Sequence, residues 1–202
     1  MSFLGTPYGG WYFVNSPEIS ERGVLSVGVG EDVSFDVAIA KIYDCRVVLA
    51  DPTPRSIEHF EEISRNFGSR ATEPQLLGGS QPVASYDLNG IQTDHFKFVP
   101  SALWVEEGEV DFFAPAETDH VSHSITNFQK GRSKNGPKIT VPAVTYESLC
   151  KDHFGGEAPA LVKLDIEGAE IAVLPHILRN PPSQILVEFD ELSLRDRKSI
   201  RD

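Results

Sequence analysis

Two glycines beside two acidic residues stand at the first predicted strand-to-helix turn of the chain. Residues 26–32 have the sequence SVGVGED and follow a short apolar, β-branched stretch. Glycine lets the backbone bend sharply and lets a ligand approach it, and the free N–H groups at the start of the next helix favour an anion. Any tight turn can use a Gly-x-Gly pair, but its place in the first strand–helix unit makes Gly28 and Gly30 candidate cofactor-binding residues.

The charge of this turn discriminates among cofactors. A dinucleotide fingerprint needs a third glycine where this chain has Val33. A pyrophosphate would also lie beside Glu31 and Asp32, which would repel it. S-adenosylmethionine carries an ammonium and a sulfonium and suits the turn better, so Glu31 and Asp32 are assigned to cofactor binding. An NAD-dependent oxidoreductase is the less favoured alternative.

An acid at the end of the second predicted strand extends this site. Asp51 lies 21 residues after Gly30, close to the spacing of about 20 at which an acid reaches ribose hydroxyls in dinucleotide folds. The structural alternative is an aspartate that flanks a helix in a turn. We also assign Ser101, within a predicted strand over residues 96–105, to cofactor binding.

A second group of acids follows a later apolar strand, at residues 161–166. Asp165 and Glu167 precede Gly168 and a predicted helix, and the carboxyl ends of strands face the crevice in which open α/β sheets bind ligands. Either acid could orient an acceptor, take its proton or hold a metal, or it could cap the helix. Glu188, near the end of the next strand, is predicted to contact substrate in the same crevice.

Two histidines mark a long polar loop over residues 115–138. His120 and His123 are assigned to substrate binding, because a metal site would also need a carboxylate such as Asp119. No metal is predicted. This loop and the Gly-, Pro- and Ser-rich segment 68–94 are expected to select a small-molecule or glycan acceptor.

Composition and charge limit the class of protein. The 202 residues suffice for one domain, and the net charge of −12 argues against nucleic acid as a partner. No apolar run is long enough to span a membrane, and residues 1–23 form an aromatic, Gly-rich segment unlike a signal peptide. The expected location is therefore cytoplasmic or otherwise intracellular. Two cysteines make no disulfide framework.

Strands and helices are predicted to alternate, which favours a parallel sheet with helical crossovers. Thr53 and Thr145 are predicted N-caps, Pro54 suits a first helical turn, and Pro175 should kink or restart its helix. A hairpin is predicted at Asn89-Gly90. The predicted strands are 24–28, 45–50, 96–105, 110–113, 139–141, 161–166 and 184–189, and the predicted helices are 32–43, 54–66, 146–153 and one from about 168.

Three motifs in order resemble those of FkbM-like methyltransferases. They are GVGEDVSFD at 28–36, DPTPRS at 51–56 and KLDIEGAE at 163–170, and the resemblance spans roughly residues 8–190. It implies methyl transfer from S-adenosylmethionine, usually to an oxygen of a sugar or natural product. By position, Gly28, Gly30 and Asp51 would contact the cofactor, and Asp165 and Glu167 would lie near the transferred methyl.

The sequence departs from that family's pattern in two ways. Ser26 stands where class I methyltransferases often have an acid, and Asp32 stands where they have a third glycine. The fold also normally ends with two further strands. We therefore expect a Rossmann-like class I methyltransferase α/β fold, with a mostly parallel sheet, helices on both faces and the last two strands lacking. Its exposed edge would allow self-association. The alternative is a truncated or degenerate S-adenosylmethionine-binding module without turnover.

Overall fold

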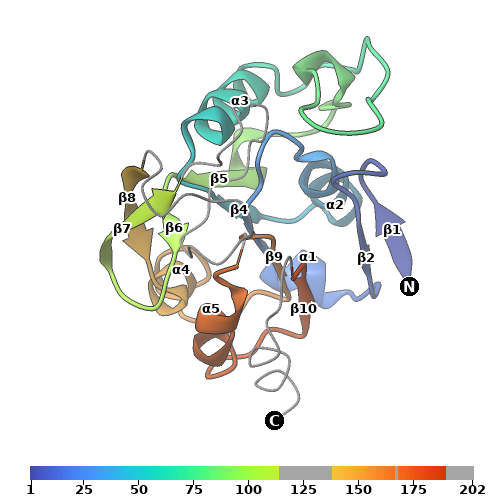
Figure 1. Cartoon of the computed structure of the whole chain (residues 1–202). Coiled ribbons are helices and arrows are strands. Elements are labelled where there is room, and N and C mark those ends of the chain that lie inside the picture. Colours follow the sequence, from blue (N-terminus) through green and yellow to red (C-terminus); the bar gives the residue numbers. More distant parts are fainter. Residues whose placement is uncertain (114–137, 167, 190–202) are drawn as a thin grey trace.

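The central element is a parallel sheet of five strands (Figure 1). The computed structural model describes residues 1–113, 138–166 and 168–189. In sheet order the strands are β10 (Gln184–Val187), β9 (Leu161–Leu164), β3 (Val24–Val27), β4 (Val47–Ala50) and β5 (Phe96–Val99), and every neighbouring pair is parallel. The predicted α/β class with a mostly parallel sheet is confirmed. Among the described residues, β10 forms one edge of this sheet.

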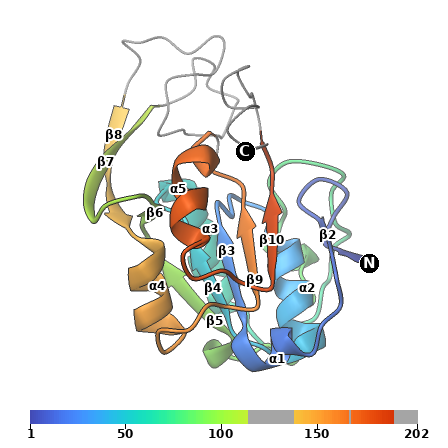
Figure 2. The same cartoon turned by 90° about the horizontal axis from the view of Figure 1, so that it is seen from below.

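Helices cover both faces of the sheet, because alternate strand residues point to opposite sides. Val24 packs into the core beneath one set of helices and Leu25 into the core beneath the other. The first set comprises α1 (Glu18–Arg22), α2 (Ser34–Tyr43) and α3 (Pro54–Arg65), and the second comprises α4 (Tyr146–His153) and α5 (Glu170–Ile177). Figure 2 shows α4 and α5 on one side of the sheet and α2 on the other. None of the helices described is long and apolar enough to cross a membrane.

The structure confirms one of the two predicted N-caps by a side-chain hydrogen bond and not the other. The Thr145 hydroxyl accepts a hydrogen bond from the Ser148 N–H (3.2 Å), which confirms it as the N-cap of α4. Thr53 precedes Pro54 as predicted, but its hydroxyl donates to Asp51 instead of capping α3. Pro175 lies in the last turn of α5, and the helix continues past it to Ile177.

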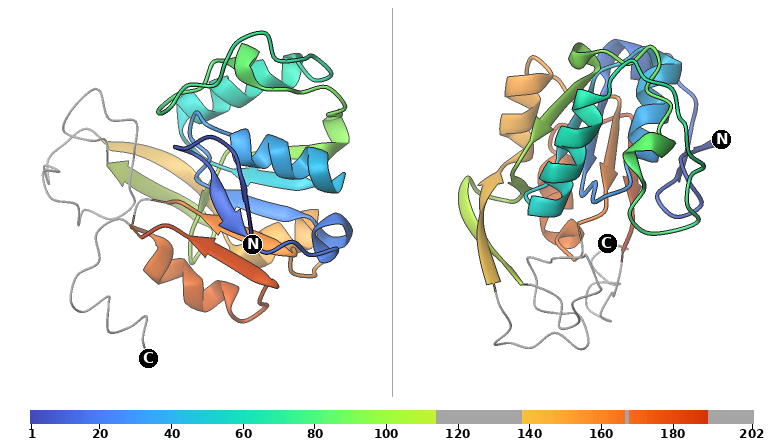
Figure 3. Two further views of the ribbon diagram at one scale, coloured as in Figure 1. Left: turned by 90° about the vertical axis from the view of Figure 1, so that its right-hand side faces the viewer. Right: turned by 90° about the horizontal axis from the view of Figure 1, so that it is seen from above.

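A second, three-stranded sheet corrects the prediction for residues 96–105. That stretch divides at Pro100, which lacks a backbone N–H for the strand ladder, into β5 and β6 (Ala102–Leu103). In the second sheet β8 (Lys138–Val144) lies between β6 and β7 (Gly108–Phe113), parallel to β6 and antiparallel to β7. Figure 3 shows β7 and β8 standing apart from the main sheet.

The segment 68–94 contains one short 3-10 turn, η1 (Val83–Ser85), and a second, η2 (Thr93–His95), begins at its end. The hairpin predicted at Asn89-Gly90 is wrong, because a turn is present there but no strands flank it. The N–H of Ile91 donates to the carbonyl of Leu88 (3.0 Å), and both of these side chains are buried in the core. The turn therefore anchors two apolar side chains and pairs no strands.

The N-terminal aromatic residues form a small antiparallel hairpin of β1 (Ser2–Leu4) and β2 (Trp11–Phe13), called the N-terminal hairpin below. Phe13 is buried edge-on against Phe35 of α2, whereas Tyr8 and Tyr12 are exposed. The Gln184 side chain donates to the carbonyl of Val14 and accepts from its N–H (both 2.8 Å). The hairpin is thereby attached to edge strand β10.

Both cysteines are buried free thiols, on opposite faces of the sheet. Cys45 packs with the α2 core and Cys150 with the α4 core. Burial raises the pKa of each thiol, that of Cys45 to about 12. Neither thiol is therefore activated as a nucleophile.

Candidate active site

The predicted site residues that the structure describes line up along one edge of the main sheet. The register pairs the last residues of all five strands at one level. The residues directly after these ends are Glu188 for β10, Asp165 for β9, Gly28 for β3 and Asp51 for β4, and Ser101 lies two residues after the end of β5. This is the carboxyl edge of a parallel sheet, where open α/β folds bind ligands.

Asp51 holds the glycine turn through its buried carboxylate, which is only 4% exposed. Its Oδ2 accepts from the backbone N–H groups of Val29 and Gly30, both at 3.0 Å. Its Oδ1 accepts from the N–H and hydroxyl of Thr53 at 2.8 and 2.7 Å. Four donors fill the roughly four acceptor positions of a carboxylate. Asp51 thus faces the turn and fixes its shape, and its assignment to cofactor binding stays a prediction.

The two glycines meet different surroundings. Gly28 has a φ of +73°, and a Cβ there would lie 1.7 Å from the carbonyl oxygen of Asp165, so no larger residue fits without a backbone shift. Gly30 has a φ of +55°, and a Cβ there would meet nothing within 4 Å. The turn is therefore closed against β9 at Gly28 and open at Gly30, where a ligand can approach its backbone.

The acids of the turn already have partners. Asp32, 6% exposed, accepts from the Thr6 hydroxyl through Oδ2 (2.6 Å) and from the Ser34 N–H through Oδ1 (2.9 Å). Glu31 lies 3.5 Å from the Arg55 guanidinium and accepts from Ser80. Their assignment to cofactor binding stays a prediction. In this structure Asp32 attaches the N-terminal hairpin to the start of α2.

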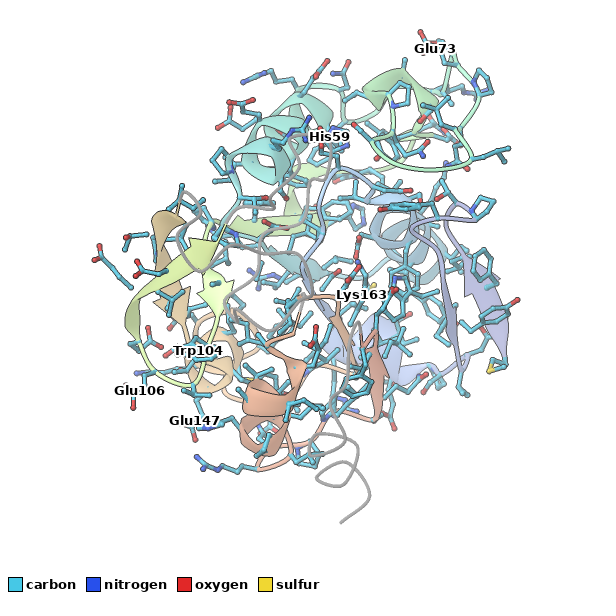
Figure 4. All side chains as sticks on the ribbon, viewed as in Figure 1. His59, Glu73, Trp104, Glu106, Glu147 and Lys163 are labelled. Carbon is cyan, nitrogen blue, oxygen red and sulfur yellow. The ribbon has the colours of Figure 1, made fainter. Side chains whose placement is uncertain are left out.

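An open pocket of about 590 Å³ lies next to the turn, between α3 and the segment 68–94. Glu31 and Arg55 line it together with His59, which Figure 4 labels on α3. The Nε2 of His59 lies 3.1 Å from the Tyr86 hydroxyl, and burial lowers the pKa of this histidine. His59 was not predicted from the sequence, because one histidine on a helix face gives no signal of a site.

A buried polar cluster, Ser26, Asp36 and Lys163, lies beneath the turn and was also not predicted. Ser26 on β3 pairs in register with Lys163 on β9, and Lys163 lies in the interior in Figure 4. Asp36 of α2 is 0% exposed, and neither its carboxylate oxygens nor the Ser26 hydroxyl completes a hydrogen bond within the described residues. Burial raises the pKa of Asp36, and the nearby Lys163 ammonium and Ser26 oppose the rise. We call these three residues the buried polar cluster.

Lys163 itself is 2% exposed and has an aromatic neighbour. Its Nζ lies 5.7 Å from the centre of the Trp11 ring in the N-terminal hairpin, a cation–π contact. Among the contacts of the described residues, Lys163 makes no hydrogen bond and no ion pair within 4.0 Å. A buried ammonium and a buried carboxylate thus lie near enough to interact electrostatically but do not form an ion pair.

Three of the predicted site residues, Glu167, His120 and His123, lie outside the described residues. Their roles stay predictions. Glu188 is exposed at the end of β10, where its backbone N–H donates to Leu164. Ser101 is half-buried beyond β5, and its role also stays a prediction.

The part of the chain that contains the sheet and the candidate site matches one known protein family. The family described as methyltransferase FkbM domain matches residues 8–196, which include every predicted site residue. Neither a curated protein nor a solved structure matches the chain significantly.

Proposed function

The chain belongs to the FkbM methyltransferase domain family, and we propose that it transfers a methyl group from S-adenosylmethionine to a hydroxyl oxygen of a small molecule or sugar. Membership of the family establishes a methyltransferase in general. The identity of the donor, the oxygen acceptor and its chemical class are the proposal.

The observation that carries the proposal is the glycine turn clamped by Asp51 next to Asp165. The turn is open at Gly30, so a ligand can contact its backbone. The surrounding carboxylates of Glu31 and Asp32 disfavour a diphosphate and favour a donor with positive charge. The orphaned oxygens of Asp36 beneath the turn add acceptor capacity. These residues fit S-adenosylmethionine better than a dinucleotide.

We propose Asp165 as the residue that acts on the acceptor. When bound, S-adenosylmethionine supplies a methyl group activated by its sulfonium. Asp165 follows β9 directly, its N–H donates to Val27 (3.1 Å), and its carbonyl abuts Gly28, so its backbone is fixed beside the turn. Its half-buried carboxylate would orient the acceptor hydroxyl and accept its proton, and alignment of acceptor and donor would supply much of the rate enhancement.

Calorimetric titration with S-adenosylmethionine and assays of S-adenosylhomocysteine formation on a panel of sugars and hydroxylated small molecules test the proposal. The chain should bind the donor and methylate at least one acceptor. Asp165→Asn should bind the donor with unchanged affinity and turn over about 10²-fold or more slowly. Absence of donor binding would refute the proposal. Binding without turnover on every acceptor would instead support the degenerate binding module, and a change in NADH fluorescence would support the oxidoreductase.

A further inference from the structure

The buried polar cluster lies beneath the glycine turn, close to the carboxyl edge of the sheet. Ser26 precedes Gly28 by two residues on the same strand, and Lys163 precedes Asp165 by two residues on the neighbouring strand. Asp36 lies in the first turn of α2, directly after the glycine turn. The cluster therefore adjoins both halves of the candidate site, one level below the edge of the sheet.

The hydrogen-bonding groups of the cluster that have no partner indicate which chemical groups a ligand would need. It offers three ammonium donors from Lys163, a carboxylate with no hydrogen bond from Asp36 and a hydroxyl from Ser26. Charges buried without direct partners are costly, so a ligand that pairs with both would lower this cost. A carboxylate and an ammonium on adjacent carbons, as in an α-amino acid, complement the pair.

The other acids near the turn have less of this capacity. Asp51 is saturated by four donors, and Asp32 is engaged by Thr6 and Ser34. Glu31 accepts from Ser80 through Oε1, whereas its Oε2 is buried without a hydrogen bond, 3.5 Å from the Arg55 guanidinium. Asp36 is the one acid next to the turn, among the residues described, for which both carboxylate oxygens are buried and unbonded. It stands beside Ser26, the position at which the sequence lacks a strand-end acid.

We propose that Ser26, Asp36 and Lys163 form the subsite for the zwitterionic amino-acid end of the methyl donor, with Lys163 pairing to its carboxylate and Asp36 to its ammonium. This inference rests on the proposed function. Under this proposal, Asp36 on α2 takes the role of the acid that class I methyltransferases often have at the position of Ser26.

The N-terminal hairpin covers this subsite. The Trp11 ring lies over the Lys163 ammonium, and Thr6 attaches the hairpin to α2 through the Ser34 hydroxyl (2.8 Å) and Asp32. A ligand carboxylate that reaches Lys163 replaces the ring as the partner of the ammonium. Binding of an amino-acid end must therefore change the surroundings of Trp11, one of two tryptophans in the chain.

Two nucleosides separate this subsite from the rest of the donor site. S-adenosylhomocysteine carries the amino-acid end, and 5′-methylthioadenosine lacks it. In calorimetric titrations, Lys163→Met and Asp36→Asn should each weaken S-adenosylhomocysteine binding at least about tenfold, while 5′-methylthioadenosine binding changes less than about twofold. Lys41→Met is the matched control, because Lys41 pairs with Asp87 at the surface, and it should leave both affinities unchanged.

Each outcome decides between the two proposals. Equal losses for both nucleosides, or no loss for either, overturn the subsite. If the unaltered chain binds neither nucleoside, the proposed function fails instead. Should either cluster variant fail to fold, Trp104→Phe leaves Trp11 as the reporter: its fluorescence should change with S-adenosylhomocysteine and stay constant with 5′-methylthioadenosine. The same response to both overturns the subsite.

Discussion

Removal of the Asp51 carboxylate should destabilise the whole domain. Asp51→Ala takes four hydrogen bonds from the glycine turn and the start of α3 and leaves the N–H groups of Val29, Gly30 and Thr53 without their acceptor. Of these three residues, Val29 is the one that is fully buried, so water can replace the carboxylate most readily at the other two.

The expected cost follows from this count. One buried N–H left without a partner costs about 1–3 kcal/mol, and the two half-buried donors add a smaller amount each. We expect Asp51→Ala to lower the free energy of unfolding by about 2–4 kcal/mol. Asp51→Asn keeps one acceptor oxygen, which can serve one of the two pairs of donors, so its loss should be about half as large.

Urea unfolding followed by circular dichroism measures these losses, and an unchanged m-value would show that the unfolding transition itself is the same. Asp87→Ala is the control, since it removes an exposed carboxylate paired with Lys41 and should cost less than about 1 kcal/mol. An Asp51→Ala protein no less stable than the Asp87→Ala protein would refute the idea that this carboxylate holds the turn.

Three further perturbations test other parts of the frame. Gly28→Ala should lower the melting temperature far more than Gly30→Ala, because its Cβ would overlap the Asp165 carbonyl whereas the space at Gly30 is empty; equal losses would contradict this. Burial lowers the pKa of His59 below its ordinary 6.5, so its neutral ring gives stability that is present above that pH and is lost as the pH falls through the lowered value. His59→Gln should flatten this part of the pH dependence of urea unfolding. Thr145→Ala should cost about 1 kcal/mol in the same assay, from the lost cap.

The edge of the sheet could be predicted from the sequence because strand ends carry their own signals. An apolar β-branched run that stops at glycine or an acid fixes both the strand and the residue at its end, and parallel pairing then brings Gly28, Asp51 and Asp165 to one level. The second sheet could not be predicted in this way. Its strands β6 and β8 are brought together by pairing between distant segments, which local patterns do not encode.

The buried polar cluster escaped prediction for a different reason. Lys163 interrupts an apolar strand, and Asp36 stands between Phe35 and Val37 in the first turn of a helix. Each has an ordinary local explanation, because acids favour the first turn of a helix and a lysine can bury its aliphatic stem while its ammonium reaches water. Only the tertiary arrangement, with Lys163 2% and Asp36 0% exposed in one compartment, shows that both are buried charges.

The polar groups around the turn therefore fall into two classes: those whose hydrogen bonds are satisfied within the chain and those whose hydrogen bonds are not. The sequence indicates Asp51 and Asp32 as site residues because of their position near the glycines. In the structure their carboxylates accept hydrogen bonds from the chain itself and give the turn its shape. A ligand would have to displace those bonds to use the same oxygens, whereas Asp36 and Lys163 gain partners without losing a hydrogen bond. We therefore expect the cluster to contribute more to ligand affinity than the acids of the turn, whose role is to hold the backbone that the ligand meets.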